Sequence, residues 1–569
     1  MTQQEIVASL PAHLRPFVRL QDYGQYSARD QAVWRFIMRQ LTRRLGDSAH
    51  PVYLEGLART GIALDHIPSV EEMNACLAEL GWQAVVVDGF IPPAIFMEFQ
   101  ALKILVIALE MRSVDHIFYT PAPDIVHESA GHAPFIVDVD YAEFLQRFGE
   151  IGMKAIASHQ DFAQYEAVRH LSIVKETADS TAADVAAAER ALEEAMAVTE
   201  EPSEAALLTR LHWWTVEYGL VGELDNYRLF GAGLLSSLGE SRNSLDDQRV
   251  KKLPLTVDAV HYPYDITRQQ PQLFVTRSCH HLGQVLEEFA AAMCFQRGGA
   301  ESLRKAIAAG TVCTARYDSG IQVSGQFVEV LCDAVGKAVY LRTSGPTQLA
   351  WRDTEIYGHG TSAHAEGFGS PVGKLKDLSR CLSEYSVDEL RAHHIVIGEP
   401  VVLEFLSGIT VRGRLQQVLR RDHRNLLLSF SDCTVTDLQG RLLFQPAWGQ
   451  YDMAVGATID SVYGGTADRE RYQLYKAAPA AAPARTGGDV TLQGLYRQVA
   501  ALAAGGGAAG LAAGLDAWPD EWLLRAELLE AGAGVDEALR QRALADLQRC
   551  AAAREDLQEV IGLVLETAP

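Results

Sequence analysis

The sequence predicts a multidomain protein with a mainly α-helical domain first, a β-rich domain of barrel or sandwich type next, and a small α-helical tail. The first observation is length, because 569 residues exceed one compact domain when a prior of roughly 150 residues per domain is applied. The second is a change in texture along the chain. Apolar residues at helical spacing give way to short β-branched runs, and helical spacing then returns.

Residues 1–305 are expected to form the helical domain. Segments 26–45 (YSARDQAVWRFIMRQLTRRL) and 100–112 (QALKILVIALEMR) carry apolar residues three and four positions apart, as amphipathic helices do. An Ala- and Glu-rich stretch from about 154 to 202 combines strong helix propensity with few aromatic residues. We expect this stretch to be an exposed helical insertion that carries no chemistry.

Residues 306–475 are expected to form the β-rich domain, for which the sequence indicates no role. Runs such as 313–331 and 425–437 are rich in β-branched residues and are separated by Gly, Asn, Asp and Ser, as in antiparallel strands joined by turns. Residues 476–489 are rich in Pro, Ala and Gly, which is typical of a linker. Residues 490–569 return to helical periodicity, with Ala and Leu prominent.

Composition excludes some classes of partner. Fifty basic and seventy-three acidic side chains give a net charge of −23, which argues against nucleic acid and anionic lipid. The eight cysteines are scattered without a CxxC pair, so neither a disulfide scaffold nor a thiolate metal site is expected. The sequence shows no signal peptide and no run of about 18 apolar residues that could span a bilayer. We therefore expect a protein of the reducing cytoplasm.

The segment 123–135 (PDIVHESAGHAPF) contains candidate metal ligands. His127 and His132 are five positions apart, which separates their side chains by roughly 140° on an ideal helix. They can bind one ion only if the second histidine lies at a helix end or distortion. Gly131 should weaken the helix there, and Pro134 should disfavour its continuation. The HExxH pattern of metallopeptidases has a four-residue separation and needs no break. Taken alone, the pair favours a simpler interpretation, one capping and one surface histidine.

A third candidate ligand is Glu217, in the apolar and aromatic segment 207–223 (LLTRLHWWTVEYGLVGE). Burial of a carboxylate beside Trp213 and Trp214 is costly unless it is paired or bound to a cation. Two imidazoles and one carboxylate form the ligand set of non-haem Fe(II) oxygenases. The alternative is a buried ion pair between Glu217 and a base such as Arg210.

Three ordered segments, PDIVHESAGHAPF, WWTVEYGL and FGAGLLSSLGE, resemble the signature segments of the pterin-dependent aromatic amino acid hydroxylases. YSARDQAVW near the start, FYTPAPDI before the first histidine and YDITRQQPQLFV at 264–275 extend the resemblance. It covers about residues 26–295, broken by the insertion, and the phenylalanine 4-hydroxylases are the members most similar in character. The resemblance implies the mainly helical catalytic fold of that family.

The resemblance implies roles for residues around the iron and the substrate. His127, His132 and Glu217 would be the iron ligands, while Asp124 and Ser236 would orient the first histidine and assist catalysis. Asp124 could also be a helix N-cap, and Ser236 could simply form a hydrogen bond at a helix end. The residues implied in substrate binding are Arg112, which would hold the carboxylate, Tyr119, Thr120, Pro121, Trp213 and Ser236.

The resemblance also implies a pterin site. Phe96 would stack on the pterin ring, with added contacts from the backbone near Gly89 and Ile91, although Phe96 could also be a core aromatic. Glu128 follows a proposed metal ligand, so we expect it to face the cavity, to bind the pterin or its water, and to assist catalysis. The implied cofactors are Fe(II) and tetrahydrobiopterin or a related tetrahydropterin, with O2 as co-substrate. His212 departs from the family pattern, because it replaces a tyrosine.

The implied reaction is ring hydroxylation of a free aromatic amino acid, L-phenylalanine to L-tyrosine in the first instance. Ile266 is apolar where tyrosine-specific members are acidic, which argues against tyrosine. It does little against tryptophan, because one apolar contact discriminates by about 1–3 kcal/mol. A zinc hydrolase with Glu128 as general base and a non-catalytic amino-acid-binding protein are the other classes considered. The expected partner is a small aromatic amino acid, with no nucleic acid and no membrane, and a homo-oligomer could form through the C-terminal regions.

Overall fold

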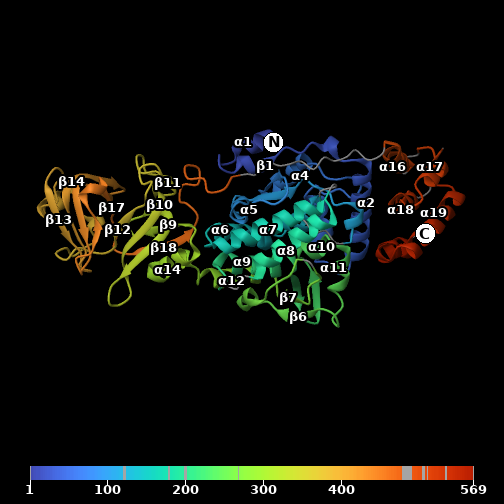
Figure 1. Cartoon of the computed structure of the whole chain (residues 1–569). Helices are drawn as coiled ribbons and strands as arrows, with labels where there is room; N and C mark the ends of the chain where they lie inside the picture. Colours follow the sequence, from blue (N-terminus) through green and yellow to red (C-terminus); the bar gives the residue numbers. More distant parts are fainter. Residues whose placement is uncertain are drawn as a thin grey trace.

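The computed structural model describes residues 2–118, 123–176, 180–197, 201–266, 268–476, 490–502, 506–508, 510–531 and 535–567. In Figure 1 the chain forms an elongated molecule with three parts in a row. Two β sheets lie at one end, helices with two smaller sheets lie in the middle, and the C-terminal helices lie at the other end. None of the helices in the described part of the chain combines the length and apolar composition needed to cross a bilayer.

The middle part surrounds a large hydrophobic cluster with helices and two small sheets, ordered β1-β2-β3 and β5-β4-β7-β6. The strands are β1 (Val18–Arg19), β2 (Gln83–Val87), β3 (Ile104–Ala108), β4 (Leu220–Glu223), β5 (Asn226–Leu229), β6 (Lys251–Pro254) and β7 (Gln272–Thr276). The helices are α1 (Gln3–Ser9), α2 (Ala28–Leu45), α3 (Val52–Arg59), α4 (Val70–Leu77), α5 (Pro93–Ala101), α6 (Val139–Gly152), α9 (Glu204–His212), α10 (Ala232–Leu235), α11 (Leu238–Asn243) and α12 (Cys279–Ala290).

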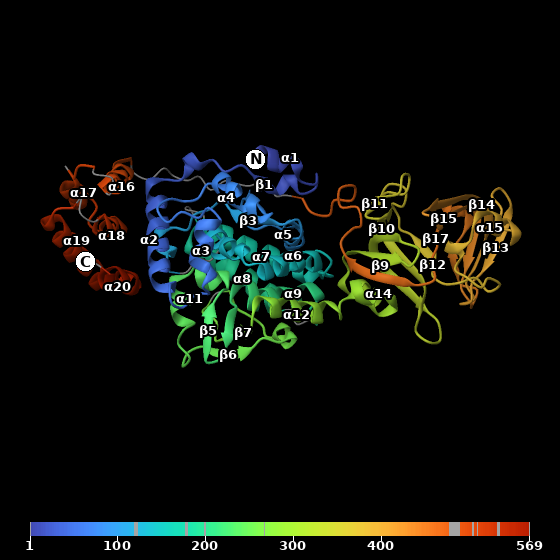
Figure 2. The same ribbon diagram turned by 180° about the vertical axis from the view of Figure 1, so that it is seen from behind.

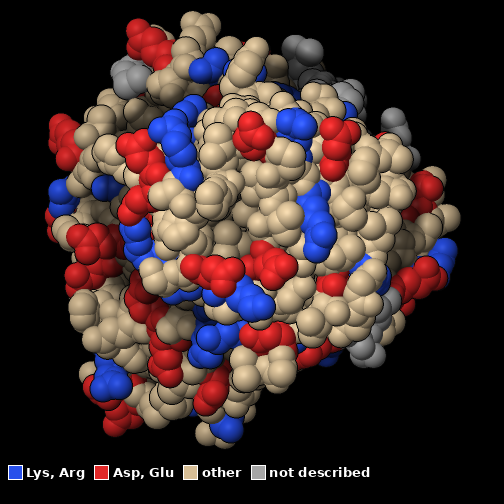
Figure 3. All heavy atoms as spheres, turned by 90° about the vertical axis from the view of Figure 1, so that its left-hand side faces the viewer, with Lys and Arg blue, Asp and Glu red and all other residues tan. Residues whose placement is uncertain are grey.

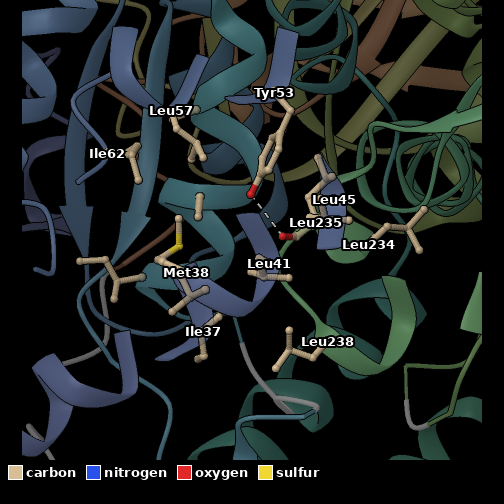
Figure 4. Packing of buried hydrophobic residues seen from close by; sticks show 14 of the residues in the cluster. Ile37, Met38, Leu41, Leu45, Tyr53, Leu57, Ile62, Leu234, Leu235 and Leu238 are labelled. Atoms are coloured by element: carbon tan, nitrogen blue, oxygen red, sulfur yellow. Dashed lines mark hydrogen bonds between the residues drawn. The ribbon is translucent and has the colours of Figure 1, made fainter. Parts of the chain in front are cut away.

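Helix α2 anchors this cluster. Its first turn is closed by a capping box of Ser27 and Asp30, in which each side chain accepts a hydrogen bond from the other residue's backbone N–H. Figure 4 shows its apolar side chains packed beside those of α3, α10 and α11. Tyr53 of α3 donates a hydrogen bond of 3.5 Å to the carbonyl of Leu235. The labelled residues of α2 are Ile37, Met38, Leu41 and Leu45.

The expectation of a helix through residues 100–112 is wrong. Helix α5 ends at Ala101, and Lys103, with φ of 60°, turns the chain into strand β3. All five residues of β3 are buried, and β3 pairs in parallel with β2. A run of apolar residues buried on both faces fits a strand as well as a helix, and spacing alone cannot distinguish them.

The insertion forms a helical hairpin of α7 (His159–Glu176) and α8 (Ala182–Ala197), which lies over the middle part in Figures 1 and 2. The two helices share a small apolar cluster of Leu171, Ala188 and Leu192. The hairpin also contacts the body of the protein, because the Tyr165 hydroxyl donates a hydrogen bond of 3.2 Å to the Phe90 carbonyl. It is therefore not merely an exposed arm.

Over residues 306–475 the sequence predicts one β-rich domain, whereas the structure has two antiparallel sheets, each with its own hydrophobic cluster. The first, ordered β11-β10-β9-β8-β18 with β12 beside β10, comprises β8 (Val312–Tyr317), β9 (Ile321–Cys332), β10 (Ala338–Trp351), β11 (Thr354–Glu355), β12 (Gly369–Pro371) and β18 (Ile459–Gly464). The second, ordered β13-β14-β15-β16 with β17 beside β15, comprises β13 (Pro400–Glu404), β14 (Thr410–Arg421), β15 (Arg424–Thr436), β16 (Leu442–Phe444) and β17 (Tyr451–Ala454).

The second sheet is inserted into the first. Strand β18 comes after the whole second sheet and pairs with β8, the first strand of the region. Turn residues mark where strands end but do not show which strands pair across long sequence separations, so the split could not be predicted from local patterns. Helices α13 (Cys294–Arg297) and α14 (Gly299–Ala309) contribute to the first cluster, and α15 (Val387–Ala392) to the second. In Figure 3, acidic and basic side chains are intermixed over the face at the second-sheet end.

The C-terminal helices pack on the outer face of α2. They are α16 (Val490–Leu502), α17 (Leu511–Ala517), α18 (Trp522–Glu530), α19 (Glu537–Ala553) and α20 (Gln558–Thr567). Phe36 of α2 meets Trp522 edge to face, with ring centroids 5.3 Å apart. Ion pairs join α2 to the tail: Arg35 to Glu527 and Arg43 to Glu530, both at 2.6 Å. The predicted linker 476–489 lies outside the described residues except for its first residue.

Candidate metal centre and cavity

Two histidines converge because the helix that carries them is a π-helix. Residues Val126–His132 form this π-helix, η5, and His127 Nε2 lies 3.2 Å from His132 Nε2. Hydrogen bonds from i to i+5 widen each turn, so residues five apart lie nearly above one another. The sequence predicts that the second histidine lies at a helix end or distortion, and η5 is such a distortion and ends at His132.

Gly131 and Pro134 have other roles. A Cβ on Gly131 would lie 2.9 Å from both the Cβ and the carbonyl oxygen of Ala232, so glycine allows η5 to contact α10 closely. Pro134 lies in the first turn of a following 3-10 helix, Ala133–Val137, where its missing N–H costs nothing. The local sequence therefore packs η5 against its neighbour and turns the chain after it.

Glu217 completes the cluster from a second π-helix, η7 (Trp213–Glu217). Its carboxylate oxygens lie 3.2 Å from His127 Nε2 and 3.4 Å from His132 Nε2. Burial by itself would raise the pKa of Glu217, but the two histidines, when charged, more than offset this and hold it well below the usual value. Arg210, the alternative partner, instead donates to the carbonyl of Val260.

Glu128 also lies near this cluster, but farther from it. Its nearest carboxylate oxygen is 3.9 Å from His132 Nε2. Burial, with the negative charge of Glu217 added, raises the pKa of Glu128 to about 8, although His132 opposes the shift. His127, His132 and Glu128 can also be grouped as potential ligands, but the shorter distances and anionic form of Glu217 make it the better third ligand.

A hydrogen-bond chain sets the tautomer of His127. The Ser236 hydroxyl donates to the Ala232 carbonyl at 2.7 Å and lies 3.1 Å from His127 Nδ1. A hydroxyl has only one hydrogen to donate, so Ser236 must accept from Nδ1–H. The lone pair of neutral His127 is therefore on Nε2, which faces His132 and Glu217.

Arg112 and Asp124 form a buried pair beside this chain. Arg112 Nε and Nη2 donate to the two carboxylate oxygens of Asp124, each at 2.7 Å, and Nη1 donates to the Ser236 carbonyl at 3.0 Å. Asp124 also accepts from the backbone N–H of His127, so it caps η5. Burial would raise the pKa of Asp124, but the charge and hydrogen bonds of Arg112 hold it below its usual value.

A cavity of about 2030 Å³ lies beside the two histidines and Glu217. The cavity wall includes the candidate ligands His127, His132 and Glu217, together with Arg112, Ser236, Gly89, Ile91, Phe96, Trp213 and Ile266. The Trp213 ring stacks with Tyr218 at 4.6 Å and with Tyr264 at 4.3 Å between centroids. Tyr165 and Leu171 bring the α7–α8 hairpin to the cavity wall. The three other expected pocket residues, Tyr119, Thr120 and Pro121, lie outside the described residues.

His212 lies between the expected pterin side and the metal cluster. Its Nδ1 is 3.7 Å from Glu217, and its ring meets Phe96 edge to face at 6.1 Å. Burial lowers the pKa of His212 to about 4, and its buried Nε2 has no hydrogen-bond partner. The sequence marks it only as a departure from the family pattern. The one feature of the sequence that could have indicated a place for His212 in the cavity is its position immediately before the aromatic pair Trp213 and Trp214.

Glu110 contacts Gly89 of the cavity wall, a contact that sequence reasoning missed. Its carboxylate accepts a hydrogen bond of 3.4 Å from the backbone N–H of Gly89, whose φ is 61°. Burial, with a hydrogen bond to Asp88 added, raises the pKa of Glu110 to about 7. Glu110 lies at the end of β3, in a segment that the sequence pattern assigned to a helix, so its approach to Gly89 was not foreseeable.

Comparison with known families identifies the class of protein. Two segments, residues 19–176 and 165–297, match the family of biopterin-dependent aromatic amino acid hydroxylases. The matched segments contain His127, His132, Glu217 and the residues around them. This part of the chain belongs to that family. The two large sheets after residue 310 and the C-terminal helices lie beyond the match.

The individual proteins to which the chain is similar include several phenylalanine hydroxylases. A phenylalanine-4-hydroxylase from Pseudomonas aeruginosa is 27% identical over 264 residues, which are 46% of this chain and 84% of that protein. A phenylalanine-4-hydroxylase from Dictyostelium discoideum is 30% identical over 232 residues, which are 40% of this chain and 42% of that protein. The Chromobacterium violaceum phenylalanine hydroxylase structure with bound iron(III) and 7,8-dihydrobiopterin is 25% identical, covers 51% of this chain and 93% of its own, and has a TM-score of 0.39.

Proposed function

We propose that this protein is an iron- and tetrahydropterin-dependent monooxygenase that converts L-phenylalanine to L-tyrosine with O2. The observation that carries the proposal is the convergence of His127, His132 and Glu217, whose donor atoms lie 3.2 to 3.4 Å apart on the cavity wall. The relatives described above are phenylalanine-4-hydroxylases, which favours phenylalanine over tryptophan and an oxygenase over a zinc hydrolase.

The donor set fits a ferrous ion. Two imidazole nitrogens and one carboxylate suit Fe(II) and leave further positions for other ligands. The tautomer of His127 places its lone pair toward the other two ligands, as metal binding requires. When bound, iron and tetrahydropterin together supply the redox chemistry with O2 that amino acid side chains lack.

Ser236, Asp124 and Arg112 would position the ligands and the substrate. Ser236 fixes the His127 ring, and Asp124 caps the helix that carries it. Arg112 has five N–H donors, of which its side chain uses three on Asp124 and Ser236. Arg112 also lines the cavity, and its two remaining donors would bind the substrate carboxylate. Trp213 and Ile266, with the expected residues Tyr119, Thr120 and Pro121, would enclose the aromatic ring.

The pterin would occupy the part of the cavity near Phe96, Gly89 and Ile91. Phe96 would stack on the ring, and the backbone near Gly89 would hydrogen-bond its edge. Glu128 lines the same cavity, and its carboxyl would hydrogen-bond the pterin or its bound water. The hairpin at the cavity wall would limit access of water.

The decisive test is product formation by the purified protein with Fe(II), tetrahydropterin, O2 and each aromatic amino acid. We expect tyrosine from phenylalanine, with no product when iron is chelated or pterin is omitted. Product that forms without pterin would overturn the proposal. Glu217→Ala should lose bound iron and turnover with an unchanged circular dichroism spectrum. The exposed Glu223, on the neighbouring β4, provides the control Glu223→Ala, which should keep both.

Arg112 has its own test. We expect Arg112→Lys to raise the KM for phenylalanine at least tenfold, because lysine cannot bridge two carboxylates as a planar guanidinium does. Iron content and the KM for the pterin should stay near wild type. An unchanged KM for phenylalanine would remove Arg112 from the substrate site.

We also propose a cytoplasmic enzyme, since none of its eight cysteines forms a disulfide. Cell fractionation would test this. A homo-oligomer formed through the C-terminal regions remains a proposal, which sedimentation of the full chain would test. The domain limits are proposals as well. A boundary at residue 305 would fall within α14 (Gly299–Ala309), which packs on the first large sheet, so a truncation should end near Met293.

A further inference from the structure

A second group of metal-binding side chains lies in the β region, outside the family match. His359 and His364 lie in the segment between β11 and β12 of the first large sheet, and Asp452 lies on β17 of the second. We propose that these three side chains bind a divalent cation of the Zn²⁺ class, which links the two sheets. This site is independent of the proposed iron centre and of the hydroxylase reaction.

The distances suit a metal ion. His359 Nδ1 is 3.2 Å from His364 Nε2, and Asp452 Oδ2 is 3.7 Å from the first and 4.0 Å from the second. A triangle with these sides has a point about 2.1 Å from all three corners, and Zn–N and Zn–O bonds are about 2.0–2.2 Å long. The cluster at the proposed iron centre has similar separations, 3.2 to 3.4 Å.

The backbone holds both histidines in place. The carbonyl of His359 accepts from Leu349 N–H at 2.9 Å, and the carbonyl of His364 accepts from Thr347 N–H at 3.0 Å. Leu349 and Thr347 both lie on β10, so one strand fixes the segment at two points. A site whose ligands are fixed in advance costs less conformational entropy to fill.

Asp452 is oriented in the same way. Its Oδ1 accepts hydrogen bonds from the Ser429 hydroxyl and, at 3.1 Å, from Gln450 Nε2. Ser429 lies directly opposite Asp452 on the paired strand β15. With Oδ1 occupied, Oδ2 is the oxygen that faces the two imidazoles. Polar groups that orient a ligating carboxylate in this way are usual around bound metals.

The surroundings favour a cation that joins two parts of the fold. The three side chains are only 9 to 13% exposed, so an ion here would be largely shielded from water. Two nitrogen ligands and one oxygen ligand suit Zn²⁺ and leave a fourth position open. One carboxylate and two neutral histidines carry a single negative charge, which a divalent cation more than balances.

Metal counting on the full-length protein tests the proposal. The chelator-stripped protein would be dialysed against Zn²⁺ alone and its metal counted by mass spectrometry. In a Glu217→Ala background, where the proposed iron centre is disabled, we expect one equivalent of Zn²⁺ per chain. Adding Asp452→Asn or His364→Gln should remove it. His393→Ala, which removes an exposed histidine of the same region, should leave the count unchanged.

A stability measurement supplements the count. Zn²⁺ should raise the Tm of the β region in the Glu217→Ala protein, and Asp452→Asn should abolish this shift. Asp452→Asn alone should keep iron-dependent turnover, which separates this site from the hydroxylase centre. If the Zn²⁺ count is unaffected by both Asp452→Asn and His364→Gln, the side chains form a metal-free hydrogen-bonded cluster and the proposal is wrong.

Discussion

At the scale of single residues, the hydrogen bond between Ser236 and His127 has the clearest chemical consequence. Because Ser236 donates to the Ala232 carbonyl, it can only accept from His127, which leaves the lone pair on Nε2. Without the hydroxyl, either tautomer of His127 becomes available and the ring can rotate. One buried serine therefore determines whether a proposed ligand is ready to bind.

We expect Ser236→Ala to weaken iron binding by about 10- to 100-fold, the usual effect of losing a group that orients a ligand. Titration of the apoprotein with Fe(II) under anaerobic conditions would measure the affinity. Ser244→Ala removes a similarly buried hydroxyl, which donates to the Ser241 carbonyl, and should leave affinity unchanged. Equal affinity for Ser236→Ala and wild type would show that the hydrogen bond does not orient the ligand.

Glu240 predicts a pH effect on stability. Burial raises its pKa to about 7, against 4.5 for the free side chain, and its Oε1 has no hydrogen-bond partner. The folded protein therefore holds this proton more tightly than the unfolded chain does. The resulting stabilisation is fully present below pH 4.5 and is lost as the pH rises through 7.

Glu240→Gln keeps the shape without the charge. At pH 8 it should stabilise the protein by on the order of 1–3 kcal/mol relative to wild type, and near pH 4.5 the difference should vanish. Thermal unfolding at both pH values would measure it. Glu223→Gln, at an exposed position, should show no such pH dependence. A gain of equal size at both pH values would rule out the titration of Glu240 as the cause.

Sequence reasoning identified site residues where a motif named them. His127, His132 and Glu217 lie in short ordered segments, and the structure brings their donor atoms together. It did not identify a role for His212, which lines the cavity, or for Glu110, which contacts Gly89, because tertiary packing creates both contacts. A lone buried histidine or glutamate has no local pattern that separates it from an ordinary one.

At the scale of elements, the two π-helices matter most. The helices η5 and η7 bring three proposed ligands from two segments together. The sequence showed that an ideal α-helix could not bring His127 and His132 together, but it could not show which distortion solves this. The π-helix η5 packs closely against α10 at Gly131, a contact that only the fold reveals.

Gly131→Ala tests that contact. A methyl group would lie 2.9 Å from both the side chain and the backbone oxygen of Ala232, so η5 or α10 must shift. We expect a loss of about 1–3 kcal/mol in stability and weaker iron binding, measured by thermal unfolding and metal titration. Gly283→Ala, in helix α12 with nothing nearby, should instead be neutral or stabilising. A fully stable, iron-binding Gly131→Ala protein would contradict this interpretation.

For the β region, the sequence predicts where some strands lie but not which strands pair. Strands β8, β9 and β15 coincide to within a residue or so with the runs 313–331 and 425–437 that the sequence predicts as strands, because strand propensity is local. The division into two sheets depends on β18 pairing with β8 across the whole inserted sheet, which no window of sequence contains. The sequence did not predict β3 as a strand. All five of its residues are buried, so it lacks the alternation of polar and apolar residues by which a half-exposed strand is recognised.

At the scale of the whole molecule, the C-terminal helices depend on α2. Arg35 and Glu527 pair at 2.6 Å with side chains only 12% and 4% exposed. In a double-mutant cycle with Arg35→Ala and Glu527→Ala, we expect a coupling energy of about 1–3 kcal/mol from thermal unfolding. The exposed pair Arg59 and Glu55 should give at most about 0.5 kcal/mol. Coupling no larger than that of the exposed pair would mean that this contact does not hold the tail.

The same contact has a consequence for how the chain is made. Arg35 and Glu527 are 492 residues apart, so at about 5–20 residues per second the ribosome completes α2 roughly 25–100 s before its partner emerges. During that interval the apolar outer face of α2, including Phe36, has no covering helices from its own chain. If the middle part folds during that interval, part of its surface stays uncovered until the C-terminal helices have been synthesised.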